Sequence, residues 1–541
     1  MNMNMNMNMN MKKNDLYLFA IVLLSIGIGY LVGSKEIRTQ FNPFRSINTE
    51  RLDRLLEYIS NDYVDEINTD SLVGKVIEDI VNKLDPHSVY IPASQRQSIA
   101  ENMQGNFEGI GVSFFMVRDT VSILRVLEGG PSEAAGILAG DKILIADNDT
   151  LYQKNYASES IIKILKGPSE TQVALTIFRK SKNEILKIDL KRGKVPLRSV
   201  ESYYMLADNI GYIKINRFSQ TTYEEFESAT KSLLAGGMKK MILDLRDNPG
   251  GYLSAARDIS DTFLDKDQTI VITQTNKGKQ ERSFAAGSGL FKDGGLVVLT
   301  NGQSASASEI VAGAIQDNDR GWVIGRRTFG KGLVQQQMPL GGGDAIRLTT
   351  ARYFTPTGRS IQKPYGSDHE AYYSDFNERI ENGEMADEKK IPIVDSLAFK
   401  TPKGRTVYGG GGIFPDVYIS NNKSEEERWN ANVLKSSLVN NFVFNELDKD
   451  RTKYEKMSED DLLNGQVIDQ LEWYEELKEH LERNGMQLNN ADKSIAINSI
   501  KAYIGFQLFG NNAYNRINNQ DDEFIKQAIQ SLNSLGITID F

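Results

Sequence analysis

The chain has no cysteine and only three histidines, His87, His369 and His480. The absence of cysteine excludes a thiol nucleophile, a disulfide and a cysteine-based zinc site. The histidines show no spacing typical of a metal motif, so we expect neither a metal nor another cofactor. A net charge of −9, without a basic stripe, gives no reason to expect nucleic acid as a partner.

The first residues predict a membrane anchor. After a Met-Asn repeat expected to be disordered, Lys12 and Lys13 precede an uncharged run over 16–34. A helix of ~19 residues just spans a hydrocarbon core, and the flanking lysines favour a cytoplasmic amino terminus. The alternative is a cleaved signal peptide, because Val32 and Ser34 form a passable cleavage site. Either interpretation predicts that the remaining chain lies outside the cytoplasm.

The patterning of the remaining chain predicts several domains, since 541 residues exceed one hydrophobic core. Helical spacing is followed by short β-type runs between glycines, then by alternating buried strands, glycine turns and helices, and last by a polar helical pattern. The alternating part is typical of an α/β layer, so the expected fold class is multidomain α/β. The predicted regions are a disordered start with an anchor (1–40), a helical segment (41–103), a β-rich domain (104–193), an α/β core (194–422) and a helical extension (423–541).

A first candidate for chemistry is the segment GQSASASEIVAGAI at 302–315, which follows an apolar strand. Ser306 and Glu309 have the S-x-x-E spacing of a capping box, so Ser306 is expected at a helix start. Unpaired N–H groups there favour a developing oxyanion, and small neighbours leave room for a peptide. Taken alone, the serine is more often only a cap.

A second candidate is the segment RTFGKGLVQQQ at 327–337. Lys331 lies between two glycines in a mostly apolar setting, and an extended chain would point Lys331 and Gln335 to one face. Gln335 could then orient the amine. Burial can lower the pKa of a lysine from ~10.4 to near 7, as a lysine base requires. An ordinary ion pair with a carboxylate is the alternative.

A third candidate is the turn DLRDNPGG at 244–251, which follows an apolar strand. Its glycines permit close approach of another chain and leave backbone N–H groups accessible. We expect Gly250 and Gly251 to form half of an oxyanion hole, with the N–H of Ala307 as the other half. An ordinary tight turn is the alternative for this segment.

The three segments, in this order, closely resemble the carboxyl-terminal processing peptidases, the S41-type Ser–Lys family that includes the tail-specific and photosystem D1-processing proteases. LDPHSVYIP (84–92) and GIFPDVYI (412–419) extend the resemblance over roughly 48–420. The resemblance implies a ββα-superhelix-type protease core, with Ser306 as nucleophile, Lys331 as base and Gln335 as the residue that orients Lys331. It implies that Ser304 and Ser308 are not the nucleophile.

The β-rich region resembles the PDZ domain inserted in this family. FEGIGVSF (107–114) matches the loop whose N–H groups receive a terminal carboxylate, and the next strand would pair with the peptide. The implied peptide-binding residues are Gly109, Ile110, Gly111 and Val112. The resemblance implies protein substrates with exposed apolar carboxyl termini. A small β-rich spacer without a ligand is the alternative.

The implied activity is a serine endopeptidase that cleaves envelope proteins recognised by their tails. With the predicted anchor, it would be a single-pass protein of a bacterial inner membrane with its catalytic part in the periplasm, or be secreted there after signal cleavage. Family members form dimers or use lipoprotein adaptors, so either partner is expected. Two alternatives are a Ser–His–Asp protease, for which His87 is the candidate base, and a non-catalytic PDZ scaffold that presents clients to another protease.

Overall fold

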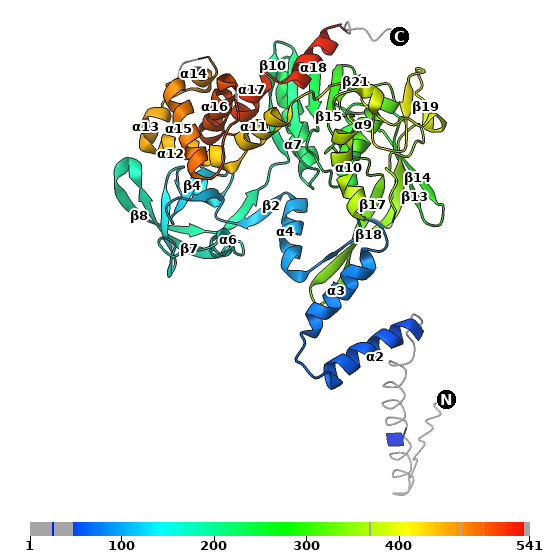
Figure 1. Ribbon diagram of the computed structural model, residues 1–541, viewed down its shortest axis with the longest axis horizontal. Coiled ribbons are helices and arrows are strands. Elements are labelled where there is room, and N and C mark those ends of the chain that lie inside the picture. The colour runs from blue at the N-terminus through cyan, green and yellow to red at the C-terminus, as the bar shows by residue number, and fades with distance from the viewer. Residues whose placement is uncertain (1–23, 26–46, 367–368, 465–467, 491, 535–541) are drawn as a thin grey trace, which may run out of the picture. The chain divides into compact units, whose positions relative to one another are not determined.

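The computed structural model describes residues 24–25, 47–366, 369–464, 468–490 and 492–534, and the chain separates into two units, 1–79 and 80–541 (Figure 1). Apart from 24–25, the predicted anchor at 16–34 lies outside the described residues. Within the described residues, no helix has the length and apolar character needed to span a membrane.

The amino-terminal unit contains α2 (Ile47–Asp62) and the start of α3 (Thr69–Val81). Both helices lie within the helical segment predicted over 41–103. Leu52 and Leu55 are 38% and 53% exposed.

The second unit is built around a six-stranded sheet. Adjacent strands of this sheet run parallel, except for the first two in the order given below, which are antiparallel. Parallel strands bring their carboxyl ends to one edge, where sites commonly form. The strand order is β10 (Val200–Ala207), β11 (Ile210–Ile215), β12 (Lys240–Asp244), β15 (Gly295–Thr300), β16 (Trp322–Gly325) and β21 (Val417–Tyr418).

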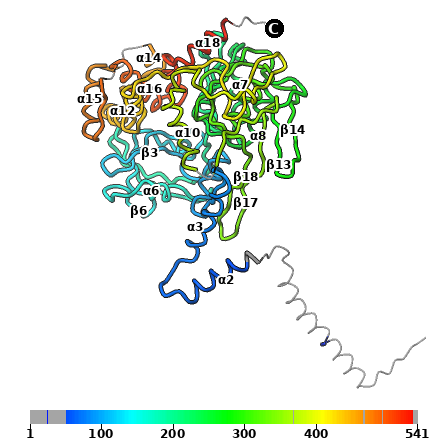
Figure 2. Tube along the Cα trace, turned by 45° about the vertical axis from the view of Figure 1, so that its right-hand side comes forward, coloured from blue at the N-terminus to red at the C-terminus, as the bar shows by residue number. Residues whose placement is uncertain are grey.

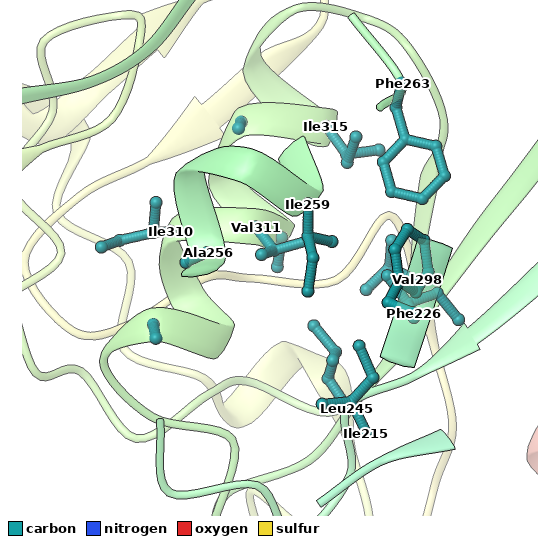
Figure 3. Packing of buried hydrophobic residues seen from close by; sticks show 14 of the residues in the cluster. Ile215, Phe226, Leu245, Ala256, Ile259, Phe263, Val298, Ile310, Val311 and Ile315 are labelled. Carbon is teal, nitrogen blue, oxygen red and sulfur yellow. The ribbon is translucent and has the colours of Figure 1, made fainter. Parts of the chain in front are cut away.

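Helices cover both faces of this central sheet, because side chains alternate between the faces along each strand. One face packs against α7 (Thr222–Ala235), α8 (Leu253–Asp261) and α9 (Ala307–Asp317). Figure 3 shows this core, in which Val298 of the sheet lies near Phe226, Ile259 and Val311 of the three helices. The other face packs against α18 (Glu523–Ser534), through residues such as Ile242, Val297 and Phe524.

A second, antiparallel sheet lies beside this core and carries the segment with Lys331. The order is β1 (Val89–Ile91), β18 (Asp344–Phe354), β13 (Thr269–Thr275) and β14 (Gln280–Phe284), and β17 (Leu333–Gly341) pairs with β18. Lys331 therefore lies two residues before an extended strand.

The β-rich domain has its own core, and the strands predicted for it are confirmed. Its sheet order is β3 (Val112–Met116), β4 (Val121–Val126), β5 (Lys142–Ala146), β7 (Gln172–Arg179) and β8 (Glu184–Lys191). The pair β2 (Asn106–Gly109) and β9 (Gly193–Pro196) forms where the chain enters and leaves this domain. The short helix α5 (Pro131–Ala134) follows β4, and the longer α6 (Ser158–Leu165) follows β6 (Asp149–Thr150).

The carboxyl-terminal helices divide into two groups. The first group forms a bundle with a separate apolar core, comprising α11 (Glu425–Leu434), α12 (Ser437–Lys449), α13 (Arg451–Tyr454), α14 (Glu459–Asn464), α15 (Gln470–Arg483), α16 (Lys493–Phe509) and α17 (Asn511–Asn519). The bundle contacts the β-rich domain, where the rings of Phe115 and Phe444 are 6.1 Å apart (Figures 1 and 2). The last helix, α18, packs on the central sheet. The helical extension predicted over 423–541 thus contributes one helix to the core.

Candidate active site

Ser306 occupies the turn between β15 and α9, at the carboxyl end of a central parallel strand. Its φ of 55° and ψ of −111° are unusual for a residue with a side chain, and such strain is concentrated at functional sites. The predicted capping arrangement is present, because the Glu309 carboxylate accepts the Ser306 N–H at 2.8 Å. The serine is therefore presented on a strained turn that its own helix fixes.

Glu309 links this turn to the segment that carries Lys331. Its carboxylate is fully buried. One oxygen accepts the N–H groups of Ser306 and Lys331, each at 2.8 Å. The other accepts the Thr328 hydroxyl at 2.6 Å and the Gly330 N–H at 2.7 Å. Burial raises the pKa of Glu309 to about 7, against the lowering effect of these four donors.

Tyr353 makes a second link between the same two residues. It lies on β18 with 1% of its surface exposed. Its hydroxyl lies 3.0 Å from the Ser306 carbonyl oxygen and 2.6 Å from that of Lys331. The main chains of both residues are thus held on their N–H side by Glu309 and on their carbonyl side by Tyr353.

The Lys331 side chain is directed at Gln335, because its Nζ donates to Gln335 Oε1 at 2.9 Å. Burial, and to a lesser extent the positive charge of Arg347, lowers the pKa of Lys331 to about 8. Among the described residues, no hydrogen bond joins Lys331 Nζ to Ser306 Oγ. The main-chain N–H groups of the two residues nevertheless share one acceptor, the same oxygen of Glu309.

The turn after β12 lies against Ser306. Gly250 has a φ of 99°, and a Cβ placed there would lie 2.8 Å from Ser306 Cβ and 2.9 Å from Ala307 N. Its own N–H donates to Asn248 Oδ1 at 2.9 Å. No hydrogen bond from the N–H of Ala307 or of Gly251 occurs within the part of the chain that the structure describes. Gly250 therefore supplies space, and the N–H groups of Ala307 and Gly251 have no protein acceptor among the described residues.

Ser304 and Ser308, which flank Ser306, are engaged in the framework. The Ser304 hydroxyl donates to the carbonyl of Leu245 at 2.8 Å, and the Ser308 hydroxyl donates to that of Asn248 at 2.9 Å. Both side chains are fully buried. These hydroxyls attach α9 to the turn after β12.

His87 lies next to Gln335, since its carbonyl oxygen accepts the Gln335 side-chain N–H. Its Nε2 lies 2.8 Å from the hydroxyl of Tyr372. Burial, followed by the charge of Lys331, lowers the pKa of His87 to about 3. The His87 Nε2 is directed at Tyr372, and a pKa of about 3 gives the imidazole little basicity, so these properties do not favour His87 as the base.

The residues predicted to bind a peptide carboxylate lie between two strands. Gly109 ends β2, Val112 begins β3, and Ile110 and Gly111 form the buried connection, with a φ of 81° at Gly111. Within the described sheet, β3 pairs only with β4. Its other edge can accept a further strand.

Several residues of this site carry no signal in the sequence. Tyr353 is one tyrosine among 22 and reaches Ser306 through the register of β18. Tyr372 likewise acts across a large sequence separation. Only Glu309 had a recognisable local pattern. That pattern predicted its role in the capping box but not its three hydrogen bonds to residues 328–331.

Comparison with known proteins gives three family matches. Residues 209–370 match peptidase family S41, 109–190 match the PDZ domain, and 429–510 match a family of unknown function. The first match covers four strands of the central sheet, β11, β12, β15 and β16, with the catalytic candidates, and the second covers most of the β-rich domain.

The similar proteins include proteases of several bacteria. A carboxy-terminal-processing protease of Bartonella bacilliformis is 33% identical over 352 residues, which cover 64% of this chain and 80% of that protein. A CtpA-like serine protease of Staphylococcus aureus is 32% identical over 338 residues, covering 62% and 66%. The solved structure of a photosystem II D1 C-terminal processing protease is 24% identical, with a TM-score of 0.35, and covers 67% of this chain and 85% of that one. The chain thus belongs to peptidase family S41 and is a serine protease of the carboxy-terminal-processing type.

Proposed function

We propose that Ser306 is the nucleophile, Lys331 the general base and Gln335 the residue that orients the base. The observation that carries this proposal is a partly buried lysine with a lowered pKa, whose main chain is joined to that of Ser306 through Glu309 and Tyr353. A lysine base must be neutral, and burial favours the neutral amine.

In the proposed reaction, neutral Lys331 takes the hydroxyl proton of Ser306 as Oγ attacks the scissile carbonyl carbon. The N–H groups of Ala307 and Gly251 donate to the resulting oxyanion. Collapse of the tetrahedral intermediate breaks the C–N bond, and the Lys331 ammonium gives its proton to the leaving amine. Water then attacks the acyl-enzyme with Lys331 again as base, and the proton returns to Ser306 Oγ.

We further propose that the PDZ domain selects substrates by their carboxyl termini. The terminal carboxylate would bind the N–H groups of the loop from Gly109 to Val112, and the tail would pair with the open edge of β3. Apolar side chains of that tail would lie against the apolar core between β3 and α6. Envelope proteins with exposed apolar tails are the proposed substrates.

The test measures hydrolysis of an unfolded protein that ends in an apolar tail. A second substrate, identical except that its tail consists of aspartates, is measured for comparison. Ser306→Ala and Lys331→Ala should each lower kcat/KM by ~10³-fold or more. The matched controls Ser304→Ala and Ser308→Ala should keep a measurable part of the activity, because their hydroxyls only bind the framework. Full activity of Ser306→Ala would refute the proposed catalytic roles. Equal rates of cleavage of the two substrates would refute the proposed role of the PDZ domain.

The location is also proposed on the sequence alone. A helix over 16–34 would hold the protein in the inner membrane with residues after 34 in the periplasm. Fusions of a reporter that is active only outside the cytoplasm, placed before residue 16 and after residue 48, should give signal only at the second site. The reverse result would refute this topology.

A further inference from the structure

The helix α10 (His369–Glu381) contacts both segments that surround Lys331. Arg379 is 2% exposed, and its guanidinium donates to the carbonyls of Thr328 at 2.9 Å and Phe329 at 3.3 Å, just before Lys331. On the same helix, Tyr373 donates to the carbonyl of Pro86. The helix thus joins the base segment to the loop at 84–88.

Tyr372 precedes Tyr373 on this helix and is 4% exposed. Its hydroxyl lies 2.8 Å from His87 Nε2 and 3.2 Å from Gln362 Nε2. Gln362 Oε1 accepts the N–H of Gly332, the residue after Lys331, at 2.8 Å. One side of Tyr372 is therefore connected to the main chain beside the base.

The other side of Tyr372 leads to the side chain of the base. The carbonyl of His87 accepts the Gln335 side-chain N–H, and Gln335 Oε1 accepts Lys331 Nζ. The hydrogen bonds form a closed ring that starts at the Lys331 amine and returns to the main chain one residue later. We call this set the base ring; its members are Lys331, Gln335, His87, Tyr372, Gln362 and Gly332.

The direction of the hydrogen bonds in the base ring follows from its donors. Gln362 uses its oxygen for Gly332, so its nitrogen donates to the Tyr372 hydroxyl. The Tyr372 proton is then directed to His87 Nε2, and neutral His87 carries its proton on Nδ1. Burial, with the charge of Lys331, lowers the pKa of His87 to about 3, which keeps it neutral wherever the enzyme works.

We propose that Tyr372 is a positioning residue of the peptidase, which keeps the Gln335 oxygen directed at Lys331 Nζ by holding His87 and Gln362. This inference rests on the proposed role of Lys331. Gln335 has an oxygen and a nitrogen at its tip, and only the oxygen can accept from the amine. While His87 occupies the nitrogen, the oxygen stays on Lys331.

The measurement is the pH profile of kcat and KM for the full chain on the apolar-tailed substrate. In Tyr372→Phe, kcat should fall about tenfold with KM within about twofold, because orientation of the base is needed for the chemical step. The rising limb should move to higher pH, because a looser Lys331 is better hydrated and its pKa rises toward the ordinary lysine value. Tyr372→Phe removes one titratable hydroxyl beside His87 and leaves the other groups that face Lys331 and His87 in place, which are Arg347 of β18, Glu309 of α9, and Asp85, Lys363 and His369.

Two further variants separate positioning from folding. Tyr373→Phe removes a hydroxyl from the same helix that lies outside the base ring, so its rising limb should match that of the unmodified protein. Gln362→Leu breaks the base ring and leaves the aromatic contacts of Tyr372, and its limb should move as in Tyr372→Phe. Melting temperatures show which variants are folded, and Gln362→Leu decides the question if Tyr372→Phe is not.

The outcomes also separate this inference from the proposed catalytic roles. If the rising limb of the pH profile is unchanged in folded Tyr372→Phe, the proposed role of the base ring is overturned. The same holds for an unchanged limb in Gln362→Leu if Tyr372→Phe does not fold. A shift in Tyr373→Phe equal to that in Tyr372→Phe would also overturn it. If Lys331→Ala is inactive at the same time, the role of Lys331 stands and only the inference about Tyr372 fails. If Lys331→Ala is active, the proposed function itself fails.

Discussion

Lys331 sets the pH at which the proposed reaction runs. Because the neutral amine is the base and its pKa is about 8, kcat/KM should rise about tenfold per pH unit below that value and level off above it. Lys331→Arg, which stays protonated, should be inactive over the same range. An activity of the unmodified protein that is constant from roughly pH 6 to 9 would contradict a lysine base.

A substitution at Gly250 tests whether activity requires the close approach of the turn after β12 to Ser306. In Gly250→Ala the new methyl group would lie 2.7 Å from the Ala305 carbonyl oxygen and 2.8 Å from Ser306 Cβ. We expect a loss of activity of at least about 10²-fold, since one oxyanion contact alone has that value.

The matched control for Gly250 is Gly237→Ala. Its φ of 90° is similar, but no atom lies within 4 Å of the added Cβ. It should cost about 1 kcal/mol in the free energy of unfolding and leave kcat/KM unchanged. Equal activities of the two variants, measured with denaturation curves, would show that the close approach at Gly250 is unimportant.

At the scale of elements, the packing of α18 on the central sheet leads to a prediction about stability. Phe524 packs on the central sheet and lies under the guanidinium groups of Arg246 at 4.7 Å and Arg326 at 4.9 Å. Phe524→Ala should lower the free energy of unfolding by about 3–5 kcal/mol. Glu523→Ala on the exposed side of α18 serves as the control and should change it by less than about 0.5 kcal/mol. Chemical denaturation measures both, and equal effects would refute the role of α18 in the core.

The elements also show what the sequence could predict. The strands around 241–244 and 296–299 are continuous apolar runs because both faces of the central sheet are buried. The strands of the β-rich domain also have local patterns, such as the alternating burial of β7. The base ring could not be predicted, since Gln362 and Tyr372 reach Gly332 and His87 only after β17, β18 and α10 are folded together. The partner of α18 was missed for a similar reason. An apolar stripe such as Phe524, Ile525 and Leu532 predicts that one face of the helix is buried, but it does not identify the element that buries this face.

For the whole molecule, the contact between the PDZ domain and the helical bundle can be measured directly. Phe115 on β3 meets Phe444 on α12 edge to face, and Arg125 lies 4.7 Å from the ring of Phe506. A double-mutant cycle of Phe115→Ala and Phe444→Ala should give a coupling of about 1 kcal/mol in the free energy of unfolding. The control cycle pairs Phe115→Ala with Phe226→Ala in the peptidase core and should show no coupling. A zero value in the first cycle would show that the two domains do not rely on this contact.

The position of α18 has a consequence for how the protein is made. The sheet strands are synthesised first, and every other described element precedes α18 in the chain. Until residues 523–534 emerge, the side chains of Tyr212, Ile242 and Val297 have no cover on that face. The packing of the central sheet on this face is therefore completed only after α18 has joined the strands that precede it in the chain.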